Sequence, residues 1–213
     1  MPELIAERLR QCSNIRSVVN CLLDRALQVS SAGFGNIQLM NWKAGYLEIK
    51  AQRGFDDEFL NFFERVELEN SSACARALRS RDSVVVEDIV VDPQFSPCLD
   101  VVLRAGVQAV QSTPLVSSSG ALVGILSTHF PMPHRPTDMQ MRIMKEVGQL
   151  AANTIIRLRA GAQTVDSEVD ITDDPPNRDE FYERLLTSKR LLIESREVMV
   201  RTEMLLARSP WHV

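Results

Sequence analysis

Apolar positions along the chain change their spacing several times, and each spacing predicts a different element. Residues 3–30 place apolar side chains three and four residues apart, which predicts one amphipathic helix. Residues 34–42 and 46–53 alternate with a period of two around a short glycine-containing segment, which predicts a β-hairpin. Residues 107–116 and 121–130 predict a second hairpin, closed by a serine-rich loop.

Shorter runs lie between the two hairpins. They predict a helix that carries Phe59 through Val66, a helix that starts at Ser71 or Ser72 and continues through Leu78, a strand at 83–89 and a helix at 99–105. Helical spacing returns after residue 136 and continues to about residue 159, and it starts with a Thr-x-x-Gln capping box. Because the helices are grouped between antiparallel hairpins, we expect an α+β fold in which an antiparallel sheet is flanked by helices.

The last quarter of the chain differs in composition. Residues 166–180 contain seven acidic residues and one basic residue around a Pro-Pro pair, which is typical of a solvated linker. Apolar residues seven apart then predict a C-terminal helix that docks on its own domain or in a dimer bundle. The expected organisation is an N-terminal helix at 1–30, a domain at 31–160, an acidic linker at 161–177 and a C-terminal helix at 178–213.

Charge and cysteine content exclude several classes of protein. The chain has 213 residues and a formal net charge of −4, which argues against a nucleic-acid-binding module driven by positive charge. No apolar run approaches the roughly 20 residues of a membrane helix, and the first residues lack the features of a secretory signal. Cys12 and Cys21 lie in one predicted helix, too far apart along it for a disulfide, and no Cys-x-x-Cys pair occurs. We therefore expect reduced thiols, a cytoplasmic location and no membrane partner.

Several short motifs follow one another in a characteristic order. They are Gly35-Asn36-Ile37-Gln38-Leu39, Ala51-Gln52-Arg53-Gly54-Phe55, Val86-Glu87-Asp88-Ile89 with Asp92-Pro93, Ala105-Gly106-Val107-Gln108-Ala109, Ser112-Thr113-Pro114-Leu115, and Gly120 through His129. Together they make residues 15–160 resemble a GAF domain, and in particular the sensory GAF domains of bacterial histidine kinases. The resemblance implies a GAF-like, PAS-related fold that binds a small molecule beside its sheet and forms dimers.

Candidate ligand-binding residues follow from this resemblance. Ser127 and His129 alternate on one face of the last strand, and Gln38 and Ser112 are polar residues in otherwise apolar strands. A buried amide, hydroxyl or imidazole needs a partner, which is either a ligand or another protein group. Asp88 and Phe95 flank the loop that covers the pocket in GAF domains, although turn chemistry and core packing would also explain them.

Signatures of catalysis are absent from the sequence. It contains no phosphate-binding P-loop, no HExxH zinc motif, no GxSxG nucleophile elbow and no pattern of metal ligands. The segment around Cys98 is loosely similar to the bilin-attachment segment of phytochromes, but Leu99 stands where that segment has histidine, so a covalent bilin is not expected. The identity of any cofactor stays unknown.

The resemblance therefore predicts a non-catalytic sensory module of bacterial signal transduction. We expect a homodimer that binds a small molecule and signals to a separate kinase or regulator, with no nucleic-acid partner. Two alternatives remain open: a thiol-dependent reductase that uses Cys74 or Cys98, and a ligand-free domain for protein interaction. Replacing both cysteines tests the first alternative, and a closed pocket is the expectation of the second.

Overall fold

A six-stranded antiparallel sheet forms the centre of the computed structural model, which describes residues 2–163 of the chain. The strands have the spatial order β3-β2-β1-β6-β5-β4, so the two predicted hairpins, β1–β2 and β5–β6, meet where β1 pairs with β6. The strands are β1 (Phe34–Asn41), β2 (Tyr46–Arg53), β3 (Arg65–Glu67), β4 (Val84–Val86), β5 (Ala109–Val116) and β6 (Leu122–Phe130). The predicted α+β fold is confirmed.

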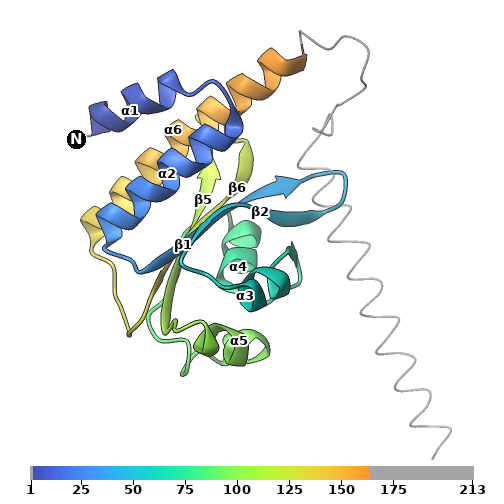
Figure 1. Ribbon diagram of the computed structural model, residues 1–213, viewed down its shortest axis with the longest axis vertical. Coiled ribbons are helices and arrows are strands. Elements are labelled where there is room, and N and C mark those ends of the chain that lie inside the picture. The colour runs from blue at the N-terminus through green and yellow to red at the C-terminus, as the bar shows by residue number, and fades with distance from the viewer. Residues whose placement is uncertain (1, 164–213) are drawn as a thin grey trace, which may run out of the picture. The chain divides into compact units, whose positions relative to one another are not determined.

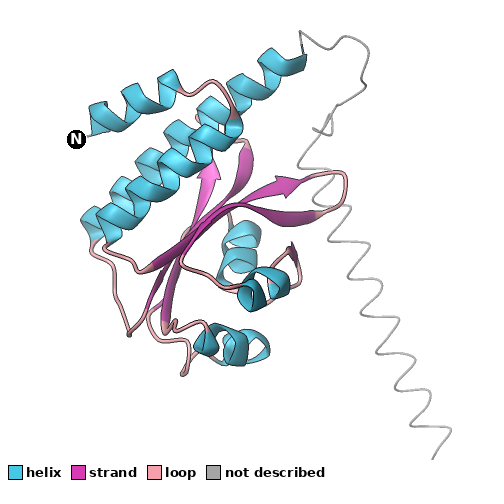
Figure 2. Ribbon diagram, in the orientation of Figure 1, coloured by secondary structure: helices cyan, strands magenta, loops and turns pink. Residues whose placement is uncertain are grey.

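Helices cover both faces of the sheet, as Figures 1 and 2 show. One face carries α1 (Pro2–Gln11), α2 (Ile15–Ser30) and α6 (Asp138–Gln163). The other face carries α3 (Asp57–Phe62), α4 (Ala73–Ser80), the 3₁₀ helix η1 (Pro93–Cys98) and α5 (Leu99–Arg104). Because both faces are covered, β6 is buried along its whole length, β1 is buried except at its two ends, and β5 is buried except at its last residue.

The two faces of the sheet differ in polarity. The face toward α2 and α6 is an apolar core to which α2, α6 and the sheet all contribute, with Leu22, Leu23, Ala26, Ile37, Leu126, Val147, Ala151 and Ile155 among its residues. Successive side chains of a strand point to opposite faces, so Asn36 and Gln38 of β1 lie on the other face, as does Ser127 of β6. Asn36, Gln38 and Ser127 therefore lie under α3, α4 and α5.

The single helix predicted over residues 3–30 is wrong, because the structure divides it into α1 and α2. The backbone of Asn14 is extended, and its side-chain oxygen accepts a hydrogen bond from the Ser17 amide at 2.8 Å. Asn14 is thus the N-cap of a new helix. Cys12 and Cys21 consequently do not lie along one helix, and the length argument against a disulfide between them fails. Both are free thiols in the structure.

Other boundaries are partly corrected and partly confirmed. The helix expected to reach Val66 ends at Phe62, because Val66 belongs to the edge strand β3 and pairs there with Leu47 of β2. The predicted capping box is present. The backbone N–H of Gln140 donates to Thr137 Oγ1 at 3.2 Å, and the backbone N–H of Thr137 donates to Gln140 Oε1 at 2.8 Å. Both hairpin glycines, Gly45 and Gly120, have positive φ, which favours glycine there.

Two of the expected parts lie outside the described residues. The linker predicted at 161–177 lies outside them except for its first three residues, which belong to α6. The C-terminal helix predicted at 178–213 lies wholly outside them. Within residues 2–163, no helix is both long and apolar enough to cross a membrane.

Candidate functional site

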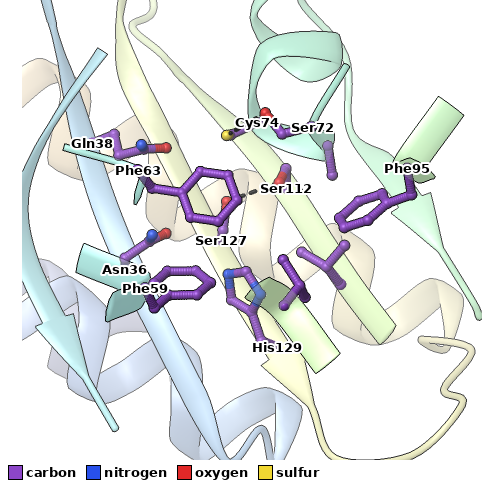
Figure 3. Close-up of a pocket in the computed structure, with 13 residues that line it drawn as sticks. Asn36, Gln38, Phe59, Phe63, Ser72, Cys74, Phe95, Ser112, Ser127 and His129 are labelled. Atoms are coloured by element: carbon purple, nitrogen blue, oxygen red, sulfur yellow. Dashed lines mark hydrogen bonds between the residues drawn. The ribbon is translucent and has the colours of Figure 1, made fainter. Parts of the chain in front are cut away.

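A small cavity lies between the polar face of the sheet and the helices that cover it (Figure 3). Strands β1, β5 and β6 supply one wall, and α3, α4, η1 and α5 supply the other. The lining residues are Asn36, Gln38, Phe59, Phe63, Ser72, Ala73, Cys74, Phe95, Val102, Val110, Ser112, Ser127 and His129. The cavity has a volume of about 20 Å³, which is room for about one water molecule. The structure therefore shows a closed pocket.

Hydroxyl groups meet at the centre of the sheet wall. Ser112 of β5 and Ser127 of β6 stand opposite each other in register, and their hydroxyls share a hydrogen bond of 2.8 Å. Both side chains are buried. Each hydroxyl can form a further hydrogen bond, because a serine oxygen has one donor and two acceptor sites. This pair thus provides a fixed hydroxyl group on the sheet wall of the cavity, beside Val110.

Aromatic rings form one side of the cavity around His129. Phe55 and Phe59 stack with ring centroids 3.7 Å apart, and Phe59 contacts Phe63 at 4.6 Å. The imidazole of His129 meets Phe55 and Phe59 edge-on, at 5.0 and 5.9 Å. Burial among these apolar rings lowers the pKa of His129 to about 3, because the charged form loses its hydration. His129 is therefore a neutral imidazole at neutral pH.

Five buried polar atoms at this cavity have no hydrogen-bond partner within the described part of the protein. They are Oδ1 of Asn36, both side-chain amide atoms of Gln38 and both ring nitrogens of His129. Figure 3 shows the three side chains directed into the cavity from β1 and β6. A buried polar atom without a partner costs about 1–3 kcal/mol. The cluster is thus unfavourable as it stands, and it is an arrangement that a bound molecule with hydrogen-bonding groups would stabilise.

Cys74 in the cavity lining and Cys98 at the end of η1 are both buried thiols. Cys74 is buried and its sulfur lies 3.2 Å from the Ser72 hydroxyl. Burial raises the pKa of Cys74 to about 11 and raises the pKa of Cys98 as well. Only a minute fraction of Cys74 would be thiolate at neutral pH, and the thiolate is the reactive form. Among residues 2–163, no cluster of histidine, cysteine, aspartate and glutamate could hold a metal ion.

The segment that covers the cavity is anchored at two points. Arg76 of α4 forms a half-buried ion pair of 2.6 Å with Asp92, which also caps η1 through a bond to the Gln94 amide. At its other end, the Glu87 carbonyl accepts a hydrogen bond of 2.9 Å from the His134 amide. The ring of His134 stacks on Phe130 at 3.8 Å, at the end of β6. The covering segment is thus joined directly to the connection between β6 and α6.

Five of the six candidate residues named from the sequence line this one cavity: Gln38, Phe95, Ser112, Ser127 and His129. Asp88 does not, because its carboxylate accepts a hydrogen bond from the Val90 amide in a turn outside the cavity. Asn36 was missed, although alternation with Gln38 placed it on the same face. Phe59 and Phe63 were missed as site residues because only the tertiary fold brings α3 over the sheet.

Comparison with known proteins places this geometry in a family. The model of the GAF domain family matches residues 12–155. A methyl sulfide methyltransferase-associated sensor of Methanosarcina acetivorans is 23% identical over 99 residues, which are 46% of this chain. The chain covers only about a tenth (10%) of the length of that protein.

Two solved structures have the same fold at low sequence identity. A domain assigned to a two-component sensor histidine kinase of Sinorhizobium meliloti is 19% identical, with a TM-score of 0.57, and the match covers 73% of this chain and 99% of that one. A free methionine-R-sulfoxide reductase of Neisseria meningitidis, determined with its substrate, is 14% identical with a TM-score of 0.59. That match covers 75% of this chain and 89% of that one.

Proposed function

The chain belongs to the GAF domain family, and we propose that it is a non-catalytic sensory module that binds a small molecule in the cavity on the polar face of its sheet. The observation that carries this proposal is the group of five unpartnered polar atoms on Asn36, Gln38 and His129. The similarity to sensor proteins supports a role in signal transduction. The transmitted signal would be a change in the helices on the opposite face.

A route for that change follows from the contacts of the covering segment. A ligand larger than one water must displace a lining side chain such as Phe59, Phe63 or Phe95, because the cavity has no room for it. Movement of the segment 87–98 would pull on the Glu87–His134 hydrogen bond, and His134 leads into α6. Ligand binding would thereby alter the position or stability of α6.

Dimerisation is part of the same proposal. The helices α1, α2 and α6 leave several apolar side chains only partly buried, including Ile143, Leu150, Ile156 and Leu158 of α6. A second copy of the chain would cover them. Native mass spectrometry of the full chain measures the oligomeric state, and a monomer at micromolar concentration would contradict this part of the proposal.

The binding proposal is tested by thermal unfolding against a library of metabolites. We expect at least one compound to raise the midpoint, and we expect the cavity-filling variant Ser127→Leu to lose that response. Thr128→Val is the matched control, because Thr128 points to the opposite face and should keep the response. Hydrogen exchange with the compound bound should change in residues 87–98 and in α6. If no compound distinguishes the parent from Ser127→Leu, the proposal is refuted.

Two alternatives have specific observations to weigh. The similarity to a methionine-R-sulfoxide reductase favours a thiol enzyme, but the raised pKa values of Cys74 and Cys98 count against it. Reductase activity that disappears in the double serine variant would favour the enzyme. The closed cavity favours a ligand-free interaction domain, which predicts partner binding that survives substitution of Ser127 and His129.

A further inference from the structure

The chemistry of the cavity restricts what kind of molecule it can accept, and this step rests on the proposed function. One water molecule would not satisfy the cluster at Asn36, Gln38 and His129. The cavity has room for about one water, and a buried water makes at most about four hydrogen bonds. Five unpartnered atoms are present on these three side chains. The remaining hydrogen bonds must come from a molecule with several polar groups of its own.

No lining side chain carries a charge at neutral pH. The lining contains no aspartate, glutamate, lysine or arginine, and its only titratable groups are His129 and Cys74. Burial keeps both neutral, since the pKa of His129 is about 3 and that of Cys74 is about 11. An ionic ligand would be buried here without a counter-ion, which strongly disfavours binding. The cavity is therefore selective for an uncharged molecule.

The shape and the hydrogen-bonding groups narrow the class further. Phe59, Phe63 and Phe95 offer apolar ring faces and edges, and these favour a flat ring. The Gln38 carboxamide presents a free donor and a free acceptor side by side. Another amide is its complement, because an amide N–H and C=O in cis pair with a carboxamide through two hydrogen bonds. Asn36 Oδ1 can accept a further N–H, and neutral His129 provides one donor and one acceptor.

We propose that the cavity binds an uncharged, planar ring compound that carries a carboxamide or lactam edge. The amide edge pairs with Gln38, and a further N–H of the ligand donates to Asn36. The ring takes the space of a displaced phenylalanine and lies against those that remain, and polar atoms on its far side contact His129 or the Ser112–Ser127 pair.

The test compares three probes that share one ring and differ in charge: benzamide is neutral, benzoate is an anion and benzylamine is a cation at pH 7. The full ¹⁵N-labelled chain is titrated with each probe, and the side-chain amide signals of Asn36 and Gln38 are followed by NMR. We expect benzamide to shift both signals and to bind at least about tenfold more tightly than the two ions, because each ion would be buried without a counter-ion.

A pair of glutamine variants tests the assigned contact. Gln38→Leu should weaken benzamide binding at least about tenfold, because leucine has a similar size but can form neither of the two hydrogen bonds. Gln111→Leu is the matched control: Gln111 is equally buried but is adjacent to Ser112 and therefore points to the opposite face. It should leave benzamide binding unchanged. Equal loss in both variants, or no loss in Gln38→Leu, overturns the pairing with Gln38.

The outcomes separate this inference from the proposed function. If benzoate or benzylamine shifts the cavity signals and binds as tightly as benzamide, the cavity is a ligand site but not one selective for neutral amides. If none of the three probes shifts a cavity signal in the unmutated chain, this inference is overturned, and the metabolite screen alone decides whether the cavity is a small-molecule site. Because the probe series needs no substitution, the result does not depend on whether a variant folds.

Discussion

Lowering the pH from 7 to 5 should destabilise this protein through the burial of His129. The side chain is 7% exposed among apolar rings, and its pKa falls from 6.5 to about 3 on folding. Because this folded pKa lies below the unfolded one, the unfolded chain binds more protons between these two values. The contribution of neutral His129 to the free energy of unfolding is therefore fully present above about pH 6.5. It is lost progressively as the pH decreases toward about 3.

The magnitude follows from the two pKa values. Between pH 7 and pH 5 the linkage amounts to about 2 kcal/mol of unfolding free energy. The result changes little for any folded pKa below about 4, because His129 is then still unprotonated in the folded state at pH 5. A loss of this size is a large part of the stability of a typical domain, which is about 5–15 kcal/mol.

Urea unfolding followed by circular dichroism measures the effect. Other titrating groups also contribute to the pH dependence, so the informative quantity is the difference between the parent and His129→Gln, in which the imidazole is absent. The parent should lose about 2 kcal/mol more than the variant between pH 7 and pH 5. His129→Phe, which is apolar and ring-shaped, should give the same difference. Equal losses in parent and variants would refute the argument, because the imidazole would then be able to take up its proton in the folded protein.

Three further predictions concern the framework of the site. Gly124→Ala should lower the free energy of unfolding, measured with urea, by about 3 kcal/mol, since its Cβ would lie 2.2 Å from the Gln38 carbonyl oxygen. Gly161→Ala is the control: its Cβ meets open space, so it should be neutral or stabilise α6 by up to about 1 kcal/mol. Asn14→Ala should lower stability by about 1 kcal/mol through loss of the N-cap, and Asn14→Ser should restore most of it; a thermal midpoint unchanged by Asn14→Ala would contradict the cap. Arg76→Met should cost about 2 kcal/mol and increase hydrogen exchange in residues 88–98, and unchanged exchange there would mean that the ion pair with Asp92 does not anchor the segment.

Local sequence chemistry predicted most of the elements. Period-two alternation located both hairpins, and glycine and serine marked their loops, because these patterns depend on neighbours a few residues away. The N-cap at Asn14 is also a local signal. The prediction missed it because the helical spacing of apolar residues continues across residues 12–14. The edge strand β3 was missed for a different reason: three residues carry too little periodicity, and their strand character depends on pairing with Leu47 in β2.

The candidate site was predictable from one of its two walls. Gln38, Ser112, Ser127 and His129 are polar residues in apolar strands, and the family resemblance implied that one face of the sheet lines a pocket, so these four were named as candidates. Phe95 was also named through the family resemblance. Phe59 and Phe63 were not named, because no local sequence pattern indicates that α3 packs over β6. Asp88 was named as a candidate but lies outside the cavity lining. A carboxylate near a pocket loop and a carboxylate in a turn look the same in sequence.

The sequence by itself determined the two hairpins, most of the helices around them and the family of the fold, because these depend on short-range periodicity and on motif order. The tertiary structure alone decided that the polar residues are enclosed, that His129 lies among phenylalanine rings and that five polar atoms have no partner within the described residues. Burial and hydrogen-bond satisfaction depend on segments distant in the chain, and they set the pKa of His129 and the chemistry that the cavity selects.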